Sequence, residues 1–170
     1  MRLPSNYGKD VVMTTPNETD FRKAMSHFAT GVAVVTAKGS EGEQGATISA
    51  LTSVSLDPLL LLICLNRGSA TYRAIAEAGV FGLSILGNDH KDVAMLFASR
   101  TGDKFGSDVI ERSADGTAFV RDSLVKMHCE LVETFQGGTH ALFMARPASL
   151  ELDENRAPLL YFQGQLGISL

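Results

Sequence analysis

Features that define whole classes of protein are scarce in this sequence. Its longest apolar run extends only from Leu59 to Leu65, whereas a membrane-spanning helix needs about 20 apolar residues. Lysine and arginine number 15 against 19 acidic residues, which gives a formal net charge of -4. A nucleic-acid groove needs a surplus of positive charge to meet the phosphates. We therefore expect neither a membrane protein nor a nucleic-acid binder.

Cysteine is equally scarce, because Cys64 and Cys129 are the only two and form no CxxC pair. A single disulfide remains open, but Cys64 lies inside the apolar run and is interpreted as a small buried hydrophobic residue. Residues 1–18 are polar and charged, without the apolar segment of a secretion signal. These features favour a cytoplasmic protein.

The common catalytic signatures are also missing. The chain contains no GxSxG, HExxH, GxxxxGK[ST] or GxGxxG pattern in the required context. Its four histidines are scattered, without the spacing of metal ligands. We expect no metal site.

What is present suits one globular domain. The chain has 170 residues, 45% hydrophobic and 20% charged, which matches the usual size and composition of a single domain with its own core. Residues 1–17 are predicted to be a flexible N-terminal arm, and residues 18–170 a single domain.

The hydrophobic periodicity predicts more strands than helices. Asn17 or Thr19 would cap a helix that carries Phe21, Met25 and Phe28 on one face and ends near Gly31. Ser69 and Asn88 would each begin a further helix, and residues 99–117 would form a long surface loop. The expected strands are 32–37, 45–56, 59–65 (buried on both faces), 80–86, 124–135, 141–152 and 159–162.

Most of these strands are separated by short turns, such as residues 38–42 and 136–140. Short turns join antiparallel strands, whereas a doubly wound parallel sheet needs a helix between nearly every pair. We therefore predict a mainly β protein, with an antiparallel sheet that closes into a barrel and so removes its exposed edges.

One expected strand carries small hydroxyl side chains. On a continuous strand Thr47, Ser49, Ser53 and Ser55 would share a face. That face is either an ordinary solvated surface or a surface against which a flat polar ligand lies close to the backbone.

Two further places could bind a ligand. Asn66 to Thr71 lead from a strand into a helix start, where free N–H groups bind phosphate and Arg67 could add charge. Ordinary capping would explain Ser69 equally well. His140 follows the glycines of a turn, where its ring could hydrogen-bond to a ligand or simply face solvent.

Taken together, these segments resemble the short-chain flavin reductases, the reductase components of two-component flavin-dependent monooxygenases. The resemblance runs in order over about residues 20–165. Its segments are 28–36, 45–58, Cys64 to Thr71, 81–86, Asp103-Lys104-Phe105, Gly138 to Phe143 and 158–162. Thr139 stands where the family often has aspartate, and Leu166 where it usually has an aromatic residue.

The resemblance implies an FMN-binding split β-barrel of Greek-key type that forms a homodimer. It implies a reductase that oxidises NADH, or NADPH, to reduce FMN or FAD and supplies the reduced flavin to a partner monooxygenase. The absence of an arginine cluster for a 2′-phosphate favours NADH.

The resemblance also implies residue roles. Backbone donors at Thr30, Gly31, Thr47, Ser49 and Ala50 would surround the polar edge of the flavin ring. Thr52 and Ser53 would hold the ribityl chain, and Asn66, Ser69 and Thr71 the phosphate, with Lys104 as a counter-charge. Val32, Cys64, Phe97 and Phe105 complete the expected cofactor-binding set. His140 is the expected catalytic residue and would orient the nicotinamide.

Two other functions fit the same fold. One is a flavin-binding or storage protein that does not turn over NADH. The other is a split-barrel FMN oxidase, although such oxidases usually surround the phosphate with several basic residues, and here Arg67 and Lys104 are the only obvious candidates.

Overall fold

The computed structural model describes residues 13–106 and 108–167. The predicted arm falls mostly on residues 1–12, which lie outside the described residues. The helices are α1 (Glu18–Ser26), α2 (Ala70–Ala78) and α3 (Lys91–Ala98). The strands are β1 (Thr30–Gly31), β2 (Ala33–Gly39), β3 (Gly42–Ile48), β4 (Leu51–Leu56), β5 (Leu59–Asn66), β6 (Val80–Ile85), β7 (Ile110–Arg112), β8 (Ala118–Val120), β9 (Val125–Gly137), β10 (His140–Leu152), β11 (Leu160–Phe162) and β12 (Gln165–Leu166).

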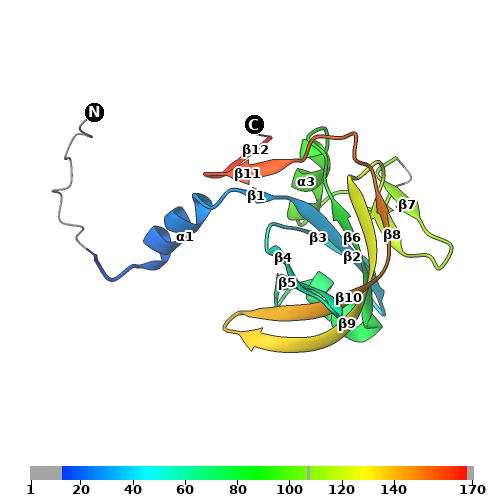
Figure 1. The fold of residues 1–170 in the computed structure, drawn as a ribbon, viewed down its shortest axis with the longest axis horizontal. Helices are drawn as coiled ribbons and strands as arrows, with labels where there is room; N and C mark the ends of the chain where they lie inside the picture. The colour runs from blue at the N-terminus through cyan, green and yellow to red at the C-terminus, as the bar shows by residue number, and fades with distance from the viewer. Residues whose placement is uncertain (1–12, 107, 168–170) are drawn as a thin grey trace.

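The largest sheet is antiparallel throughout and has the order β3-β2-β6-β9-β10-β5-β4. Its two edge strands, β3 and β4, follow one another in the chain and are joined only by Ser49 and Ala50. The Cys64 amide donates to the carbonyl of Ala50 at 3.2 Å. The sheet must therefore curl until its two edges meet at this junction, and the prediction of a mainly antiparallel β fold is confirmed (Figure 1).

The same junction corrects the prediction of one strand over residues 45–56. β3 ends at Ile48 and β4 begins at Leu51, and the two pair with different neighbours, β2 and β5. The alternation of side chains is therefore interrupted at Ser49 and Ala50. The hydroxyl groups of Thr47 and Ser53 do not share one continuous strand face.

Two apolar cores lie against the curled sheet. The first contains Val35, Ile63 and Phe143, with Ile75 supplied by α2. The second contains Val34, Leu86 and Leu159, with Phe97 supplied by α3. Because Val34 and Val35 are neighbours on β2, their side chains point to opposite faces. The helices α2 and α3 therefore cover opposite faces of the sheet.

Helix α1 is tied to the C-terminal end of the described chain. Its last residue, Ser26, accepts a hydrogen bond from the Gln163 amide at 2.7 Å, and Thr30 of β1 pairs with Tyr161 of β11. The helix ends at Ser26 and not near Gly31, because Thr30 and Gly31 are drawn into this strand pairing. Of the two expected caps, Asn17 and Thr19, Asn17 is the one used, within a capping box completed by Asp20.

Three other sequence expectations were wrong in detail. Part of the expected loop 99–117 is strand β7, which is stabilised because Ile110 is buried in the second core and pairs with Val120. The N-cap position of α3 is His90 and not Asn88, because the His90 carbonyl accepts the first helical hydrogen bond, from the Ala94 amide; the His90 side chain makes no capping hydrogen bond. The expected five-residue turn 136–140 is narrowed to Gly138 and Thr139, with Gly138 at a φ of 61°.

Strand β5 differs from the expectation of burial on both faces. Leu61, Ile63 and Leu65 are buried, whereas Leu60, Leu62 and Cys64 are half-buried. One face of β5 packs into the first core, and the other borders a cleft.

Candidate active site

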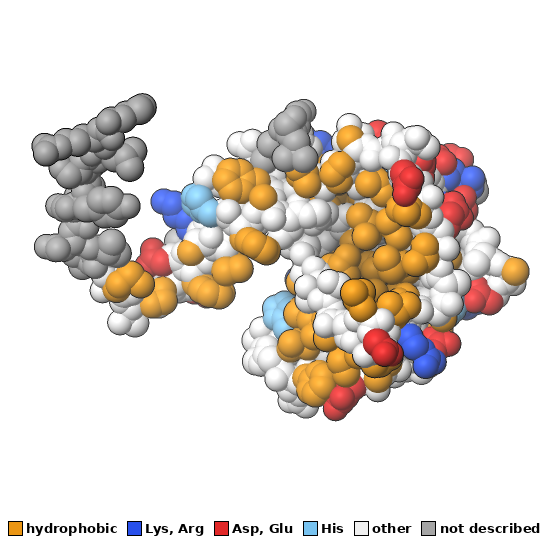
Figure 2. All heavy atoms as spheres, viewed as in Figure 1, with side chains coloured by type: hydrophobic (Ala, Val, Ile, Leu, Met, Phe, Trp, Pro, Cys, Tyr) orange, Lys and Arg blue, Asp and Glu red, His pale blue; other side chains and the backbone are white. Residues whose placement is uncertain are grey.

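A cleft of about 930 Å³ lies between α1 and the curled sheet. Figure 2 shows the hollow between α1 and the body of the molecule, with apolar side chains along the helix. The α1 side contributes Glu18, Phe21, Arg22, Met25, Ser26 and Phe28. The sheet side contributes Thr30, Ser49, Ala50, Leu51, Thr52, Leu62, Cys64, Thr139, His140 and Tyr161. Six residues expected from the sequence therefore share one cavity: Thr30, Ser49, Ala50, Thr52, Cys64 and His140.

One polar side chain of this cleft, that of Thr30, lacks a hydrogen-bond partner within the described part of the chain. Its Oγ1 atom is buried and has no hydrogen-bond partner among the described residues. A buried hydroxyl without a partner costs roughly 1–3 kcal/mol, so such groups usually meet a water or a ligand. Because Thr30 also lines the cleft, this unpaired hydroxyl lies directly behind the cleft wall.

Ser49 is the residue at which the cleft meets two smaller hollows. One, of about 280 Å³, is lined by Gly31 and Val32 as well. The other, of about 250 Å³, is lined by Val32, Thr47, Tyr161 and Leu166. Thr47 Oγ1 already donates to the Ala94 carbonyl at 2.6 Å. A ligand would therefore contact mainly the backbone of Thr47. The break after β3 thus exposes backbone groups at the centre of the site.

His140 and Asn66 come together across the sheet, where β10 begins and β5 ends. The Arg67 amide donates to the Thr139 carbonyl at 3.1 Å, and Thr139 Oγ1 lies 3.0 Å from His140 Nδ1. These bonds tie the β9–β10 turn to the loop before α2. The contact with Thr139 orients the imidazole ring on the cleft wall.

Polar groups of the loop before α2 form hydrogen bonds largely within the loop and the first turn of the helix. Ser69 Oγ accepts from the Tyr72 amide at 3.1 Å and donates to the Asn66 carbonyl at 2.8 Å, while Asn66 Oδ1 accepts from the Gly68 amide. Capping therefore accounts for Ser69 in this structure. Thr71 is only 4% exposed. The phosphate role of these residues stays a prediction.

Lys104, grouped with this loop on sequence grounds, lies elsewhere. Its Nζ donates to the carbonyls of Ser99 at 2.7 Å and Phe97 at 3.3 Å, at the end of α3. It sits 5.8 Å from the Phe97 ring, which Phe105 meets edge-on. Desolvation lowers the pKa of Lys104 below its usual value. The structure does not join Lys104 to the Ser69 loop, because α2 and α3 cover opposite faces of the sheet.

Three further expected residues line neither the cleft nor the two hollows that adjoin it. Phe97 is 2% exposed and belongs to the second core, with Phe105 packed against that core. Ser53 lies on β4 with its side chain open to solvent. Their cofactor-binding roles stay predictions.

Both cysteines are free thiols, which removes the disulfide alternative. Cys64 is half-buried on the cleft wall, where burial raises the pKa of its thiol. Cys129 is fully buried, and desolvation raises its pKa to about 12. His128, its neighbour on β9, instead contacts Asp115 and Thr117, so the two side chains lie on opposite faces of the strand.

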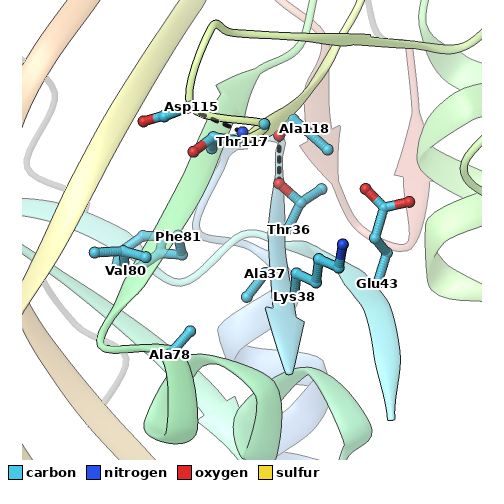
Figure 3. Close-up of a pocket in the computed structure, with 11 residues that line it drawn as sticks. Thr36, Ala37, Lys38, Glu43, Ala78, Val80, Phe81, Asp115, Thr117 and Ala118 are labelled. Atoms are coloured by element: carbon cyan, nitrogen blue, oxygen red, sulfur yellow. Dashed lines mark hydrogen bonds between the residues drawn. The ribbon is translucent and has the colours of Figure 1, made fainter. Parts of the chain in front are cut away.

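A separate cavity of about 190 Å³ lies between β2, β6 and the β7–β8 loop (Figure 3). Some of its polar groups bond to one another: Thr36 Oγ1 donates to the Ala118 carbonyl and the Thr117 amide to Asp115. None of the expected site residues lines it. The 930 Å³ cleft is therefore the stronger candidate.

Residues 13–106 and 108–167 contain no group of three or more His, Cys, Asp or Glu side chains placed to hold a metal ion. Within the same part of the chain, no helix is long and apolar enough to cross a membrane.

Some cleft residues were missed by the sequence reasoning. Tyr161 lines both the cleft and the adjoining 250 Å³ hollow, and Arg22 lines the cleft from α1. The sequence placed Tyr161 in an expected strand and in a segment of the resemblance, but gave it no role in a site. No local pattern could place Arg22, because the position of α1 depends on its contacts with the distant strand β11.

Residues 25–168 match the family model described as a flavin reductase like domain. The chain belongs to this family. The match covers the strands that build the cleft and the C-terminal hairpin β11–β12, and it confirms the resemblance stated from the sequence.

Several members of the flavin reductase-like family are similar over nearly the whole chain. The reductase component of 4-nitrophenol 4-monooxygenase/4-nitrocatechol 2-monooxygenase from Rhodococcus opacus is 35% identical, over 94% of this chain and 85% of its own. The NADH-dependent flavin reductase StyB of Pseudomonas fluorescens is 36% identical over 91% of each chain.

Solved structures show the same fold. The flavin reductase component of a bacterial two-component tryptophan halogenase superposes with a TM-score of 0.82 at 35% identity, covering 88% of this chain and 96% of that one. The NADH:FAD oxidoreductase of Streptomyces globisporus C-1027, solved with NAD and FAD fragments, superposes at 0.85 with 26% identity, over 92% and 95%.

Proposed function

We propose that this protein is an NADH-dependent flavin reductase that supplies reduced flavin to a partner monooxygenase. Family membership supports the reductase activity, and relatives named as reductase components of monooxygenases support the partner. The single structural observation that carries the proposal is the cleft in which the unpaired Thr30 hydroxyl, the exposed backbone at Ser49 and Ala50, and His140 line one space.

The cleft fits a flavin by size and by chemistry. Its volume of about 930 Å³ lies at the upper end of the usual range for ligand pockets, roughly 300–1,000 Å³. Its walls mix apolar side chains with a few hydroxyl groups, which suits a flat ring with one polar edge. A bound flavin supplies the group that accepts a hydride from the nicotinamide ring.

The residues around the Ser49 junction would hold the flavin ring. Backbone N–H groups at Ser49 and Ala50, with the Thr30 hydroxyl, would donate to the polar edge of the ring, where added negative charge is stabilised by fixed donors. The small side chains of Gly31 and Ala50 would leave room for the ring. Thr52 and Ser53 would contact the ribityl chain.

Two places remain for the flavin phosphate. Asn66, Ser69 and Thr71 lie at the N-terminus of α2, whose free amides favour an anion. Lys104 lies at the end of α3, near the 250 Å³ hollow lined by Thr47 and Ala98. We assign the phosphate to the Ser69 loop, because it adjoins His140 and the cleft.

His140 would orient the nicotinamide ring. Hydride transfer needs no protein base, so the imidazole acts through position: its Nδ1 is engaged by Thr139, which leaves the far side of the ring for the substrate. The relatives support NADH as donor and FMN or FAD as acceptor, since one is named an NADH-dependent FMN reductase and another an NADH:FAD oxidoreductase. NADPH remains the alternative donor.

We further propose that the protein is a homodimeric split β-barrel. Phe21, Met25 and Phe28 of the α1 segment are 60%, 51% and 67% exposed, and Leu56 at the tip of the β4–β5 hairpin is 85% exposed. Burying one such side chain stabilises an assembly by roughly 1.5–3 kcal/mol. A second copy would cover these groups and close the open side of the cleft.

The two free thiols support a cytoplasmic site of action, where thiols stay reduced.

The proposal is tested by mixing the purified protein with each pairing of FMN or FAD with NADH or NADPH. We expect loss of the nicotinamide near-ultraviolet absorbance, fastest with NADH, and continued turnover under air. Flavin binding without oxidation of either nicotinamide would instead indicate a binding or storage protein. Oxidation of a small amine by tightly bound FMN, without NADH turnover, would indicate an oxidase.

A further inference from the structure

The cleft is almost uncharged except on α1. Among its described lining residues, Arg22 is the only Lys or Arg and Glu18 the only Asp or Glu. They lie one turn apart and form an ion pair, with Arg22 Nη2 at 2.6 Å from Glu18 Oε1. The sheet side of the cleft offers hydroxyl, amide and imidazole groups but no permanent charge. A charged ligand therefore meets its counter-charge only on the helix.

This ion pair is easily exchanged for another partner. Its side chains are 79% and 84% exposed, and pairs so open to solvent contribute at most about 1 kcal/mol. The contact with Glu18 uses only one of the five guanidinium N–H donors of Arg22. The remaining donors form a planar fork that suits phosphate oxygens.

Helix α1 also holds Arg22 in a defined position. Its start is capped by Asn17 and Asp20. Its last residue bonds to Gln163, and the His27 ring contacts the Phe162 ring edge-on at 6.0 Å. The helix thus forms the outer wall of the cleft, opposite strand β10, which carries His140.

We propose that Arg22 binds the phosphates of the nicotinamide dinucleotide and that Glu18 weakens this contact. The inference rests on the proposed function, since it names the group that meets the non-reacting part of the hydride donor. The outer wall suits a substrate that enters and leaves in each cycle, whereas the flavin ring would lie deeper, at the Ser49 junction. Arg22 is a specificity-determining residue in this scheme, because it selects a donor that carries a diphosphate.

The chain offers a matched control. Lys23 is the next residue on the same helix and carries the same charge, but it does not line the cleft, because adjacent helical residues point about 100° apart. Arg22→Ala and Lys23→Ala therefore remove equal charge from the same exposed helix. Glu18→Gln removes the competing carboxylate and leaves Arg22 in place.

Binding is measured by calorimetry with the flavin-saturated protein, using NAD⁺ and ADP-ribose, which carries the diphosphate without the nicotinamide. We expect Arg22→Ala to weaken both about fivefold at low salt, Arg22→Lys to weaken them less, and Glu18→Gln to tighten them about twofold. Lys23→Ala should change neither, and the Arg22 effect should shrink as salt rises. The proposal is overturned if Arg22→Ala and Lys23→Ala behave alike, or if Glu18→Gln weakens binding as Arg22→Ala does.

Kinetics separate this inference from the proposed function. Arg22→Ala should raise KM for NADH but leave unchanged the oxidation of 1-benzyl-1,4-dihydronicotinamide, which has no phosphate. The increase in KM should persist when riboflavin replaces FMN. If it disappears with riboflavin, Arg22 binds the flavin phosphate and the proposal is wrong. If no variant oxidises NADH while ADP-ribose binding still depends on Arg22, the reductase function fails and the binding site stands.

Discussion

His140 and Asn66 lie directly opposite one another where β10 begins and β5 ends. Just beyond them, the Arg67 amide donates to the carbonyl of Thr139. The turn that carries the imidazole and the loop that begins α2 are therefore one hydrogen-bonded unit. A residue proposed for the nicotinamide and residues proposed for a phosphate are held in fixed relation by the main chain, without a charged contact between their side chains.

His140→Ala is expected to lower kcat/KM for NADH by about tenfold to a hundredfold, because a misplaced donor ring loses its reactive alignment. His140→Asn should recover part of the loss, since its amide can still bond to Thr139 Oγ1. Steady-state kinetics with NADH measure both variants. Unchanged NADH turnover together with unchanged NADH affinity for the alanine variant would show that the assigned role is wrong.

Ser69→Asp separates capping from phosphate binding. Aspartate caps helices as well as serine does, so the melting temperature should stay within about a degree or two, while FMN binding weakens through charge repulsion. Ser69→Ala should instead lose about 1 kcal/mol of stability. Fluorescence titration with FMN and with riboflavin, which lacks the phosphate, makes the comparison. Normal FMN binding by the aspartate variant would remove the phosphate from this loop.

Thr30→Val should have opposite effects on stability and on binding. The valine side chain has the same shape but no hydroxyl, so it removes the unpaired buried Oγ1 and should stabilise the flavin-free protein by about 1 kcal/mol. If the hydroxyl meets the flavin, affinity for FMN and riboflavin should fall about fivefold to tenfold. Chemical denaturation without flavin and flavin titration provide the two values. A variant that binds both flavins normally would contradict the proposed contact.

Gly45→Ala and Gly31→Ala form a second contrasting pair. A Cβ on Gly45 would lie 2.6 Å from Phe97 Cε1 and 3.1 Å from the Val35 carbonyl oxygen, whereas one on Gly31 meets nothing within 4 Å. We expect Gly45→Ala to destabilise the protein by about 1–3 kcal/mol. Gly31→Ala should leave the melting temperature unchanged but weaken flavin binding, because Gly31 borders the space proposed for the ring. Equal melting temperatures for the two variants would refute the packing argument.

Asp115 should make stability depend on pH in the acid range. Hydrogen bonds from Ser113 Oγ and the Thr117 amide lower the pKa of its carboxyl from 3.8 to about 2. Because the folded state favours the ionised form, this contribution is complete above the unfolded pKa and is lost as the pH falls through the folded value. Asp115→Asn should therefore flatten the loss of unfolding free energy between these two pKa values. Denaturation at a series of acid pH values tests this, with the exposed Glu154→Gln as control. Parallel pH profiles for wild type and Asp115→Asn would refute it.

Local signals predicted many of the elements correctly. The cap at Asn17, the helix after Ser69 and the hairpin around residues 38–42 depend on neighbours within a few residues, where sterics and side-chain bonds to the backbone decide the conformation. Errors arose where a distant partner intervened. The predicted helix extended too far toward Gly31, because Thr30 and Gly31 pair with β11 instead. Ile110 was predicted to lie in a loop but belongs to a strand, because the second core buries its side chain.

The candidate site shows the same division. Six of its expected residues, Ser49 and His140 among them, line one cleft, because the motifs that carry them end or begin strands whose edges the fold brings together. Lys104 was expected beside Ser69 as a counter-charge for the same phosphate, but the packing of α2 and α3 on opposite faces separates the two residues. Tyr161 and Arg22 reach the cleft through strand pairings that no local pattern reveals.

The sequence by itself determined that this protein is a mainly antiparallel β domain with a modest content of charged residues and many small residues near Ser49. It also carried the family resemblance in the order of its motifs. Only the tertiary structure decided that β3 and β4 part at Ser49 and Ala50, that the sheet curls to bring its edges together, and that α1 walls the cleft. The physical reason is range: side-chain periodicity and capping act within a few residues, whereas strand order and helix placement follow from the burial of surfaces far apart in the chain.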